Sequence, residues 1–333
     1  MKVAIHRCAL RVAFAEHDAM TGFDITRRSI LSNAPLVAAG LGGLSASTGA
    51  LATARSGKSI SDARANELLG DPVTRARVRA RVMGSCGTET VYFFYRLSIY
   101  GYSEDDNLVP FFTMNHLSVS EWRPVADDKY QSKVFECGAY CAFDTDEPLE
   151  EWKNPFTGET RKVWHFLGGP FTVTVGADGV EARGAELNPR PLRMEAFGGK
   201  VFTNTTASMK MPNPIKPAEY PKLSSGPVSY WDTISTMASP IDQAFDDTIT
   251  SADSFSQFQN MGSWHPWMGM GARPGRNYGR AVGAKVRSLD GIPPAALKSM
   301  QTHTPRIFDR ANWTAPYFDV PEYMKSLKTD GKR

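Results

Sequence analysis

The side chains best suited to proton transfer in this chain are histidines and tyrosines set among aromatic residues. Four of the six histidines follow residue 55, and no two of these four have the spacing of adjacent metal ligands on one element. One of them, His165, lies in the run 161–166, whose Val, Trp and Phe residues predict a strand. An imidazole there could face the inside of a barrel and exchange protons near neutral pH. For any single histidine, a packed structural role is the alternative.

We predict a catalytic set in which His165 is the general base. Tyr100 or Tyr140 supplies the acid, and Arg96 holds a carboxylate or phenolate through paired hydrogen bonds. The residues predicted to contact the substrate are aromatic or imidazole side chains, namely Tyr92, Trp122, Trp152, Trp164, His116, Trp264 and His265. Elimination, decarboxylation or retro-aldol loss of a fragment such as formaldehyde would need only this chemistry.

The sequence lacks the common signatures of other chemistries. It has no Gly-x-Ser-x-Gly elbow and no His-Glu-x-x-His motif. Gly57-Lys58-Ser59 resembles the end of a phosphate-binding loop, but Ala52 stands where the first glycine of that loop belongs. We therefore predict no metal and no cofactor, and expect proton transfer and charge stabilisation to carry any reaction.

Net charge and cysteine content limit the kinds of partner and the redox state that we expect for this chain. The formal net charge is only +3, which gives no electrostatic case for binding nucleic acid. The arginines at 75, 77, 79 and 81 are expected to spread around a helix as a solvated face. Three cysteines follow residue 55, and this odd number predicts free thiols. The partner we expect is a small aromatic molecule, and the chain is compatible with a homodimer.

The N-terminal region carries the pattern of a twin-arginine export signal. Arg27 and Arg28 precede an uncharged stretch over 34–54 that is rich in Ala, Gly, Leu and Ser. Glycines interrupt this stretch, which therefore does not form a stable membrane span. We expect residues 1–54 to be leader and signal, cleavage just before Arg55, and a periplasmic mature protein.

The mature chain, residues 55–333, is predicted to form one domain that begins with helices and continues as strands. Residues 61–84 predict two helices, and residues 91–100 alternate between an apolar and a mixed face, as a strand does. Further strands are predicted at 109–114, 116–123, 130–143, 161–167, 170–176, 179–184 and 200–210, and further helices at 241–249, 252–260 and 294–301. The predicted fold is mainly β (β+α), a calycin-like curved antiparallel β barrel from about 88 to 211 with flanking helices at both ends.

Several segments resemble a known family, number 1838 in the domain-of-unknown-function series. The resemblance rests on residues 92–101 (YFFYRLSIYG) and 118–123 (SVSEWR), and most specifically on 151–159 (EWKNPFTGE). It continues through 163–166 and 264–270. Members are commonly exported by the twin-arginine route and are loosely associated with catabolism of aromatic compounds. The resemblance therefore implies export and a phenolic or lignin-derived substrate.

Three functions remain open from the sequence. The first is a cofactor-independent lyase that acts on a phenolic molecule inside the barrel. The second is a non-catalytic protein that binds an apolar or aromatic ligand, since the aromatic stripe of 91–100 is also typical of an ordinary barrel core. The third is a metal-dependent oxygenase or hydrolase, which fits the export route but not the histidine spacing. Convergence of the predicted catalytic residues on one cavity would favour the first.

Overall fold

The computed structural model describes residues 60–103, 107–182, 186–187, 193–317 and 319–329. The predicted signal at 1–54, with Arg27 and Arg28, lies outside these residues and stays a prediction. Among the helices that the structure describes, none has the length and apolar character needed to cross a membrane.

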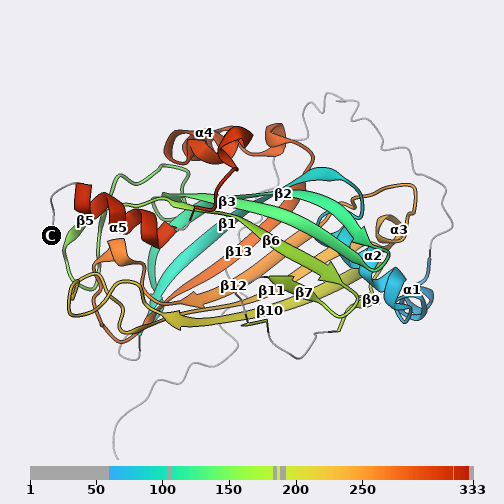
Figure 1. The fold of residues 1–333 in the computed structure, drawn as a ribbon, viewed down its shortest axis with the longest axis horizontal. Coiled ribbons are helices and arrows are strands. Elements are labelled where there is room, and N and C mark those ends of the chain that lie inside the picture. Colours follow the sequence, from blue (N-terminus) through green and yellow to red (C-terminus); the bar gives the residue numbers. More distant parts are fainter. Residues whose placement is uncertain (1–59, 104–106, 183–185, 188–192, 318, 330–333) are drawn as a thin grey trace, which may run out of the picture. The chain divides into compact units, whose positions relative to one another are not determined.

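One curled antiparallel sheet of 11 strands dominates the described residues (Figure 1). Its strands are β1 (Glu89–Tyr102), β2 (Val109–Ala126), β3 (Lys129–Cys141), β6 (Phe166–Gly176), β7 (Val180–Ala182), β8 (Glu186–Leu187), β9 (Glu195–Phe197), β10 (Lys200–Pro212), β11 (Val228–Pro240), β12 (Phe255–Gly262) and β13 (Arg276–Val286). Their order is β7-β6-β3-β2-β1-β13-β12-β11-β10-β8, and β9 pairs with β10. The end strands β7 and β8 lie close together without pairing, so the sheet curls into a half-barrel, whose concave side is called the lumen. The predicted fold class is confirmed.

Helices close one end of the sheet and cover part of its outer face. The α-helices are α1 (Asp62–Leu68), α2 (Pro72–Met83), α3 (Ile241–Ala244), α4 (Pro294–His303) and α5 (Asp319–Thr329). The 3-10 helices in the described residues are η1 (Pro266–Met268), η2 (Leu289–Gly291), η3 (Pro305–Phe308) and η4 (Arg310–Asn312). Helix α2 contacts β3, β6 and β11 and thus spans the curl, whereas α4 packs on β2 and β3. Two short strands, β4 (Glu151–Lys153) and β5 (Thr160–Lys162), form a separate hairpin.

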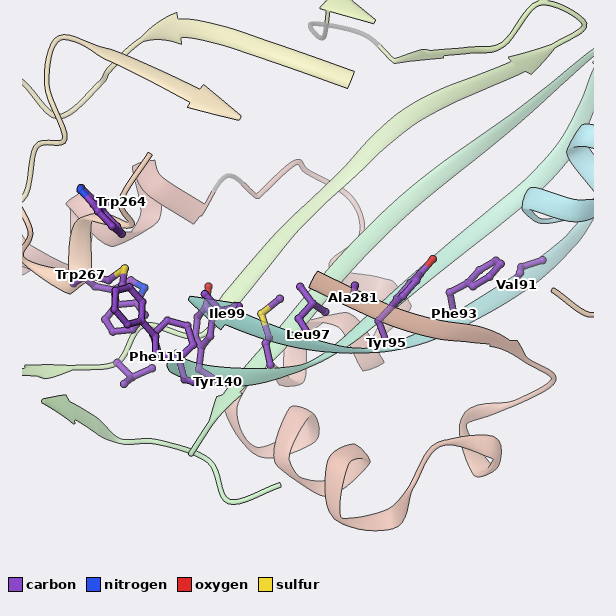
Figure 2. Close-up of a cluster of buried hydrophobic side chains, with 14 of the residues drawn as sticks. Val91, Phe93, Tyr95, Leu97, Ile99, Phe111, Tyr140, Trp264, Trp267 and Ala281 are labelled. Carbon is purple, nitrogen blue, oxygen red and sulfur yellow. The ribbon is translucent and has the colours of Figure 1, made fainter. Parts of the chain in front are cut away.

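Alternation along the strands separates an inner from an outer face. The inner row of β1 consists of Val91, Phe93, Tyr95, Leu97 and Ile99 (Figure 2). On the outer face, Leu117 of β2 and Phe135 of β3 pack with Met300 of α4 in a second cluster. Side chains on alternate positions of each strand therefore point into the lumen, and those between them point outward.

The arginines of α2 hold this helix across the opening of the curl. Arg79 and Arg81 are 3% and 2% exposed. Arg79 donates a hydrogen bond to the carbonyl of Gly176 in β6, and Arg81 donates to that of Ala244 in α3 at 2.7 Å. Lys285 of β13 donates to the Arg81 carbonyl at 2.9 Å, near the end of α2. The predicted solvated basic face is wrong for Arg79 and Arg81, because α2 turns these side chains toward the sheet.

The sheet continues well past the predicted barrel limit of residue 211. Strands β11 to β13 extend it to Val286, and β13 pairs with β1 to join the C-terminal half to the N-terminal half. The predicted helix at 252–260 is wrong, because this segment contributes to β12. Its backbone pairs with strands on both sides, and this pairing overrides the local sequence pattern.

Other boundaries differ less from the prediction. The two strands predicted within 109–123 form one strand, β2, and the strand predicted at 161–167 is divided between β5 and β6. Only α3 forms within 241–249, while the helix at 294–301 is confirmed as α4. The described cysteines, Cys86, Cys137 and Cys141, are free, as predicted.

Candidate functional site

His165 lies at the edge of β3, in the connection at 163–165 between β5 and β6. The peptide N–H of Tyr140 donates a 3.0 Å hydrogen bond to its Nδ1. The neutral ring then carries its proton on Nε2, which is buried without a partner. Burial, together with the His303 ring at a centroid distance of 4.2 Å, lowers the pKa of His165 to about 4. Because the lone pair that a general base needs is occupied, His165 acts here as a structural cap on the edge of β3.

The other predicted catalytic residues do not converge on His165. Arg96 is on the outer face of β1, 45% exposed, and forms a two-point ion pair with Asp146 at 2.6 and 2.9 Å. Tyr100 is half-buried on the same outer face. Only Tyr140 approaches His165, with ring centroids 6.1 Å apart. The four residues therefore do not form one cavity wall.

Several residues predicted to bind substrate belong to a packed aromatic cluster at one end of the lumen. Trp152 and Trp264 surround Phe111 at centroid distances of 5.1 and 6.1 Å. Figure 2 shows Phe111 and Trp264 at this end of the inner cluster. His265 lies beside this cluster, 6.1 Å from the ring of Tyr140. Ring packing accounts for the Trp152 side chain, which is 6% exposed.

The remaining predicted contacts are dispersed. Trp122 is on the inner face near α2 and donates to Ser120 at 2.8 Å. Tyr92 packs into the outer cluster under α4. Trp164 donates to Asp319 of α5 at 2.9 Å and thereby anchors that helix. Trp122 belongs to the inner hydrophobic cluster that includes Phe111, and Trp164 packs against it, whereas Tyr92 lies in the outer cluster.

The segment that carries the most specific family motif ties the β4–β5 hairpin to η1. Asn154 is fully buried, and its Oδ1 accepts hydrogen bonds from the peptide N–H groups of Phe156 and Thr157 at 2.8 and 3.2 Å. Its Nδ2 donates to the carbonyl of Met268 at 2.9 Å. The motif therefore has a structural role that closes the aromatic end of the lumen.

His116 is a predicted residue that the structure buries among the inner side chains of the sheet. It is 6% exposed on β2, directly opposite Tyr95 of β1, with ring centroids 5.5 Å apart. The rings of Phe166 and Phe258 flank it at 6.0 and 6.4 Å. Its Nδ1 is buried and has no hydrogen-bond partner. Burial lowers the pKa of His116 to about 4, so the imidazole is neutral at pH 7 and one nitrogen is left for a ligand.

Glu136 lies beside His116 on the same inner face. The register of β2 and β3 sets His116 opposite Gly138 and Ser118 opposite Glu136, so His116 and Glu136 are diagonal neighbours. Burial raises the pKa of Glu136 to about 7, and a hydrogen bond with Ser118 offsets part of this rise. A carboxyl group with this pKa can both accept and donate a proton at neutral pH.

The inner face around these groups is partly accessible to solvent. Ser118, Glu136 and Phe258 face inward and yet are only half-buried. Tyr95 contributes a hydroxyl 3.3 Å from the Oγ of Ser256, and burial raises its pKa. We define the lumen site as Tyr95, His116, Ser118, Glu136 and Ser256.

Sequence reasoning missed Glu136 and treated Tyr95 as part of an apolar strand face. A signal for Glu136 exists in the alternation of residues 130–143. On the face that includes Tyr130, Ser132 and Tyr140, Glu136 is the single acidic residue. A lone carboxyl group on the inner face of a barrel strand is costly to bury, and so indicates a functional position.

Within the described part of the chain, no group of three or more His, Cys, Asp or Glu side chains is arranged to hold a metal ion.

Fold and site together define a protein whose curled antiparallel sheet holds titratable side chains between aromatic walls. The chain belongs to the family described as Protein of unknown function (DUF1838), whose model matches residues 88–320. This range begins just before β1, ends within α5 and includes the whole sheet, so the predicted family is confirmed. No curated protein matches the chain.

Proposed function

We propose that this protein is a cofactor-independent lyase that acts on a phenolic or lignin-derived aromatic molecule in the lumen site. The observation that carries the proposal is Glu136, a half-buried inner-face carboxyl whose pKa burial raises to about 7. General acids and bases work best with a pKa near the operating pH, and raised pKa values cluster at functional sites. The rings of Phe166 and Phe258 suit an aromatic substrate.

Glu136 is the group that moves the proton in this proposal. In a retro-aldol loss of formaldehyde, its carboxylate removes the proton of a substrate hydroxyl. The electron pair of that O–H bond forms the carbonyl of the aldehyde, and the adjacent C–C bond breaks. The electron pair of the C–C bond passes to the aromatic fragment, which takes the proton back from Glu136. The step balances without an oxidant or a metal.

His116 and Tyr95 stabilise the charge that develops in the substrate. The neutral His116 ring keeps one N–H donor and one acceptor, and its Nδ1 has no protein partner. Tyr95 is the residue opposite His116 on β1, and its hydroxyl lies 3.3 Å from the Oγ of Ser256. Donors fixed in a water-poor site stabilise a developing oxyanion more than water does.

The proposal is tested by incubating purified mature protein with a panel of lignin-type phenols that carry a hydroxymethyl group. We expect one compound to lose formaldehyde, detected by mass spectrometry of both fragments. A compound that binds stoichiometrically and is recovered unchanged across the panel would contradict lyase activity and favour a binding protein. The aromatic cluster at the end of the lumen is what supports that second function.

Export is proposed on the sequence pattern and on the family. We propose that Arg27 and Arg28 direct the folded chain through the twin-arginine route to the periplasm. Replacing both with lysine should leave precursor in the cytoplasm, and N-terminal sequencing of the periplasmic protein should begin near Arg55. Processed periplasmic protein from the Lys-Lys variant at normal levels would refute this.

A further inference from the structure

A separate cavity of about 190 Å³ lies near η1, where β11 and β13 begin and β12 ends. Trp231 near the start of β11 is opposite Gly262 at the end of β12, and Gly262 is opposite Asn277 of β13. The segment after β10, including Leu223, covers it, as does Val320 of α5. This cavity uses no residue of the lumen site, and the chemistry proposed at Glu136 leaves it without a role.

Asn277 gives the cavity one specific polar feature. Its side chain is 7% exposed, and its Nδ2 donates to the carbonyl of Ser263 at 3.2 Å. That carbonyl can only accept, so the amide orientation is chemically fixed. The Oδ1 of Asn277 is buried and has no donor. A buried acceptor without a donor is unfavourable, and a ligand that donates a hydrogen bond would satisfy it.

The walls of the cavity combine aromatic rings with uncharged Asn and Ser side chains. Tyr230 and Trp231 are each 37% exposed and offer ring surface at the rim. Trp264 donates its Nε1 to the carbonyl of Arg273 at 2.9 Å, so its ring contributes only apolar surface. Burial lowers the pKa of His265 to about 4, which keeps its ring neutral at pH 7. None of the described lining residues is an Asp, Glu, Lys or Arg, which favours a neutral ligand.

The volume limits the ligand to one ring. A protein cavity of about 150 Å³ is enough to hold benzene. We propose that this cavity is a second binding site, for a neutral single-ring phenol that stacks against Trp231 and donates its hydroxyl to the Oδ1 of Asn277. The site is independent of the lyase proposal, because it needs neither Glu136 nor turnover.

Phenol itself is the probe, with toluene as a ligand of the same shape that lacks the hydroxyl. Titration calorimetry and tryptophan fluorescence should give binding of phenol about tenfold tighter than binding of toluene. Asn277→Leu should remove this difference by weakening phenol alone. Trp231→Ala, at the exposed rim, should weaken both ligands and should be tolerated by the fold. Glu136→Gln should leave both affinities unchanged, which separates this site from the lumen.

Equal affinity for phenol and toluene in the wild-type protein would overturn the proposal, and so would absence of phenol binding. Phenol affinity that is insensitive to Trp231→Ala would overturn it as well, even if Asn277→Leu fails to fold. If Glu136→Gln abolishes phenol binding, phenol occupies the lumen and this cavity is not its site.

Discussion

The inner face around Glu136 and the outer edge around His165 contain the same types of side chain in opposite states. On the outer face of β1, Arg96 is paired with Asp146, and at the edge of β3, Nδ1 of His165 is occupied by a peptide N–H. Inside, Nδ1 of His116 has no partner, and burial raises the pKa of Glu136 to about 7. Each histidine has one buried nitrogen without a partner, but the accepting nitrogen of His165 is occupied by the fold, whereas Nδ1 of His116 is not, and the pKa of Glu136 lies where the carboxyl can exchange a proton. Polar groups that a fold buries without satisfying are the better guide to a working site.

The largest difference between the two regions is expected in the kcat of Glu136→Gln. Removing a positioned general base lowers kcat by about 10²–10⁴, and we expect that loss on the first compound shown to be converted. Glu150→Gln is the matched control, because Glu150 is 76% exposed and lies 3.8 Å from His303 at the outer edge. Steady-state kinetics with thermal midpoints measured alongside decides between them. Equal losses in both variants would remove the distinction between the two regions.

The two histidines give the next largest contrast. His116→Phe keeps an aromatic ring in the lumen and removes both nitrogens, and should lower kcat by about 10². His165→Gln keeps a hydrogen-bond acceptor for the peptide N–H of Tyr140 and should leave kcat unchanged. If instead His165→Gln loses activity while its thermal midpoint is preserved, the edge of β3 is the catalytic region.

The dependence of the unfolding free energy on pH tests whether Glu136 is buried as the structure shows. Its pKa is about 7 in the folded state against an ordinary value of 4.5, so between these values the folded state holds a proton that the unfolded state has lost. The free energy of unfolding should therefore fall as pH rises from about 4.5 to 7. Relative to Glu136→Gln, the wild type should lose on the order of 2 kcal/mol over that interval, as measured by urea denaturation. Parallel profiles for the two proteins would mean that Glu136 is not buried as described.

The smallest effect is expected from the outer ion pair. Arg96→Gln breaks a contact that is 45% exposed on the arginine side, and should cost less than about 1 kcal/mol of unfolding free energy with kcat unchanged. Denaturation and kinetics on the same preparation check this. A loss of kcat comparable to that of Glu136→Gln would return Arg96 to the site that the sequence predicts for it.

The class of the fold could be predicted from the sequence because strict alternation in 91–100 is a local signal. The extent of the sheet could not, since β12 is held by backbone pairing with β11 and β13 and its own residues show no clear strand pattern. Local sequence patterns therefore predict the N-terminal strands. They do not predict strands such as β12, whose conformation depends on pairing with segments distant in sequence.

The position of the candidate site could not be predicted from the sequence. Tyrosine, histidine and an aromatic wall do meet inside the sheet, as Tyr95 and His116. The run around His165 resembles a strand in sequence. In the structure His165 lies in the connection between β5 and β6, beside the edge of β3. Register decides which side chains are diagonal neighbours across β2 and β3, and register is set by tertiary pairing.

The most direct test of the account is nitrogen NMR of protein labelled with ¹⁵N-histidine, recorded with and without a phenol that the protein binds or converts. The ring nitrogens of each histidine report their own protonation and hydrogen bonding, with assignments from His116→Phe and His165→Gln. We predict that ligand shifts the resonances of His116, because its Nδ1 gains a partner, and leaves those of His165 unchanged. Shifts at His165 with none at His116 would contradict the claim that the lumen is the functional site.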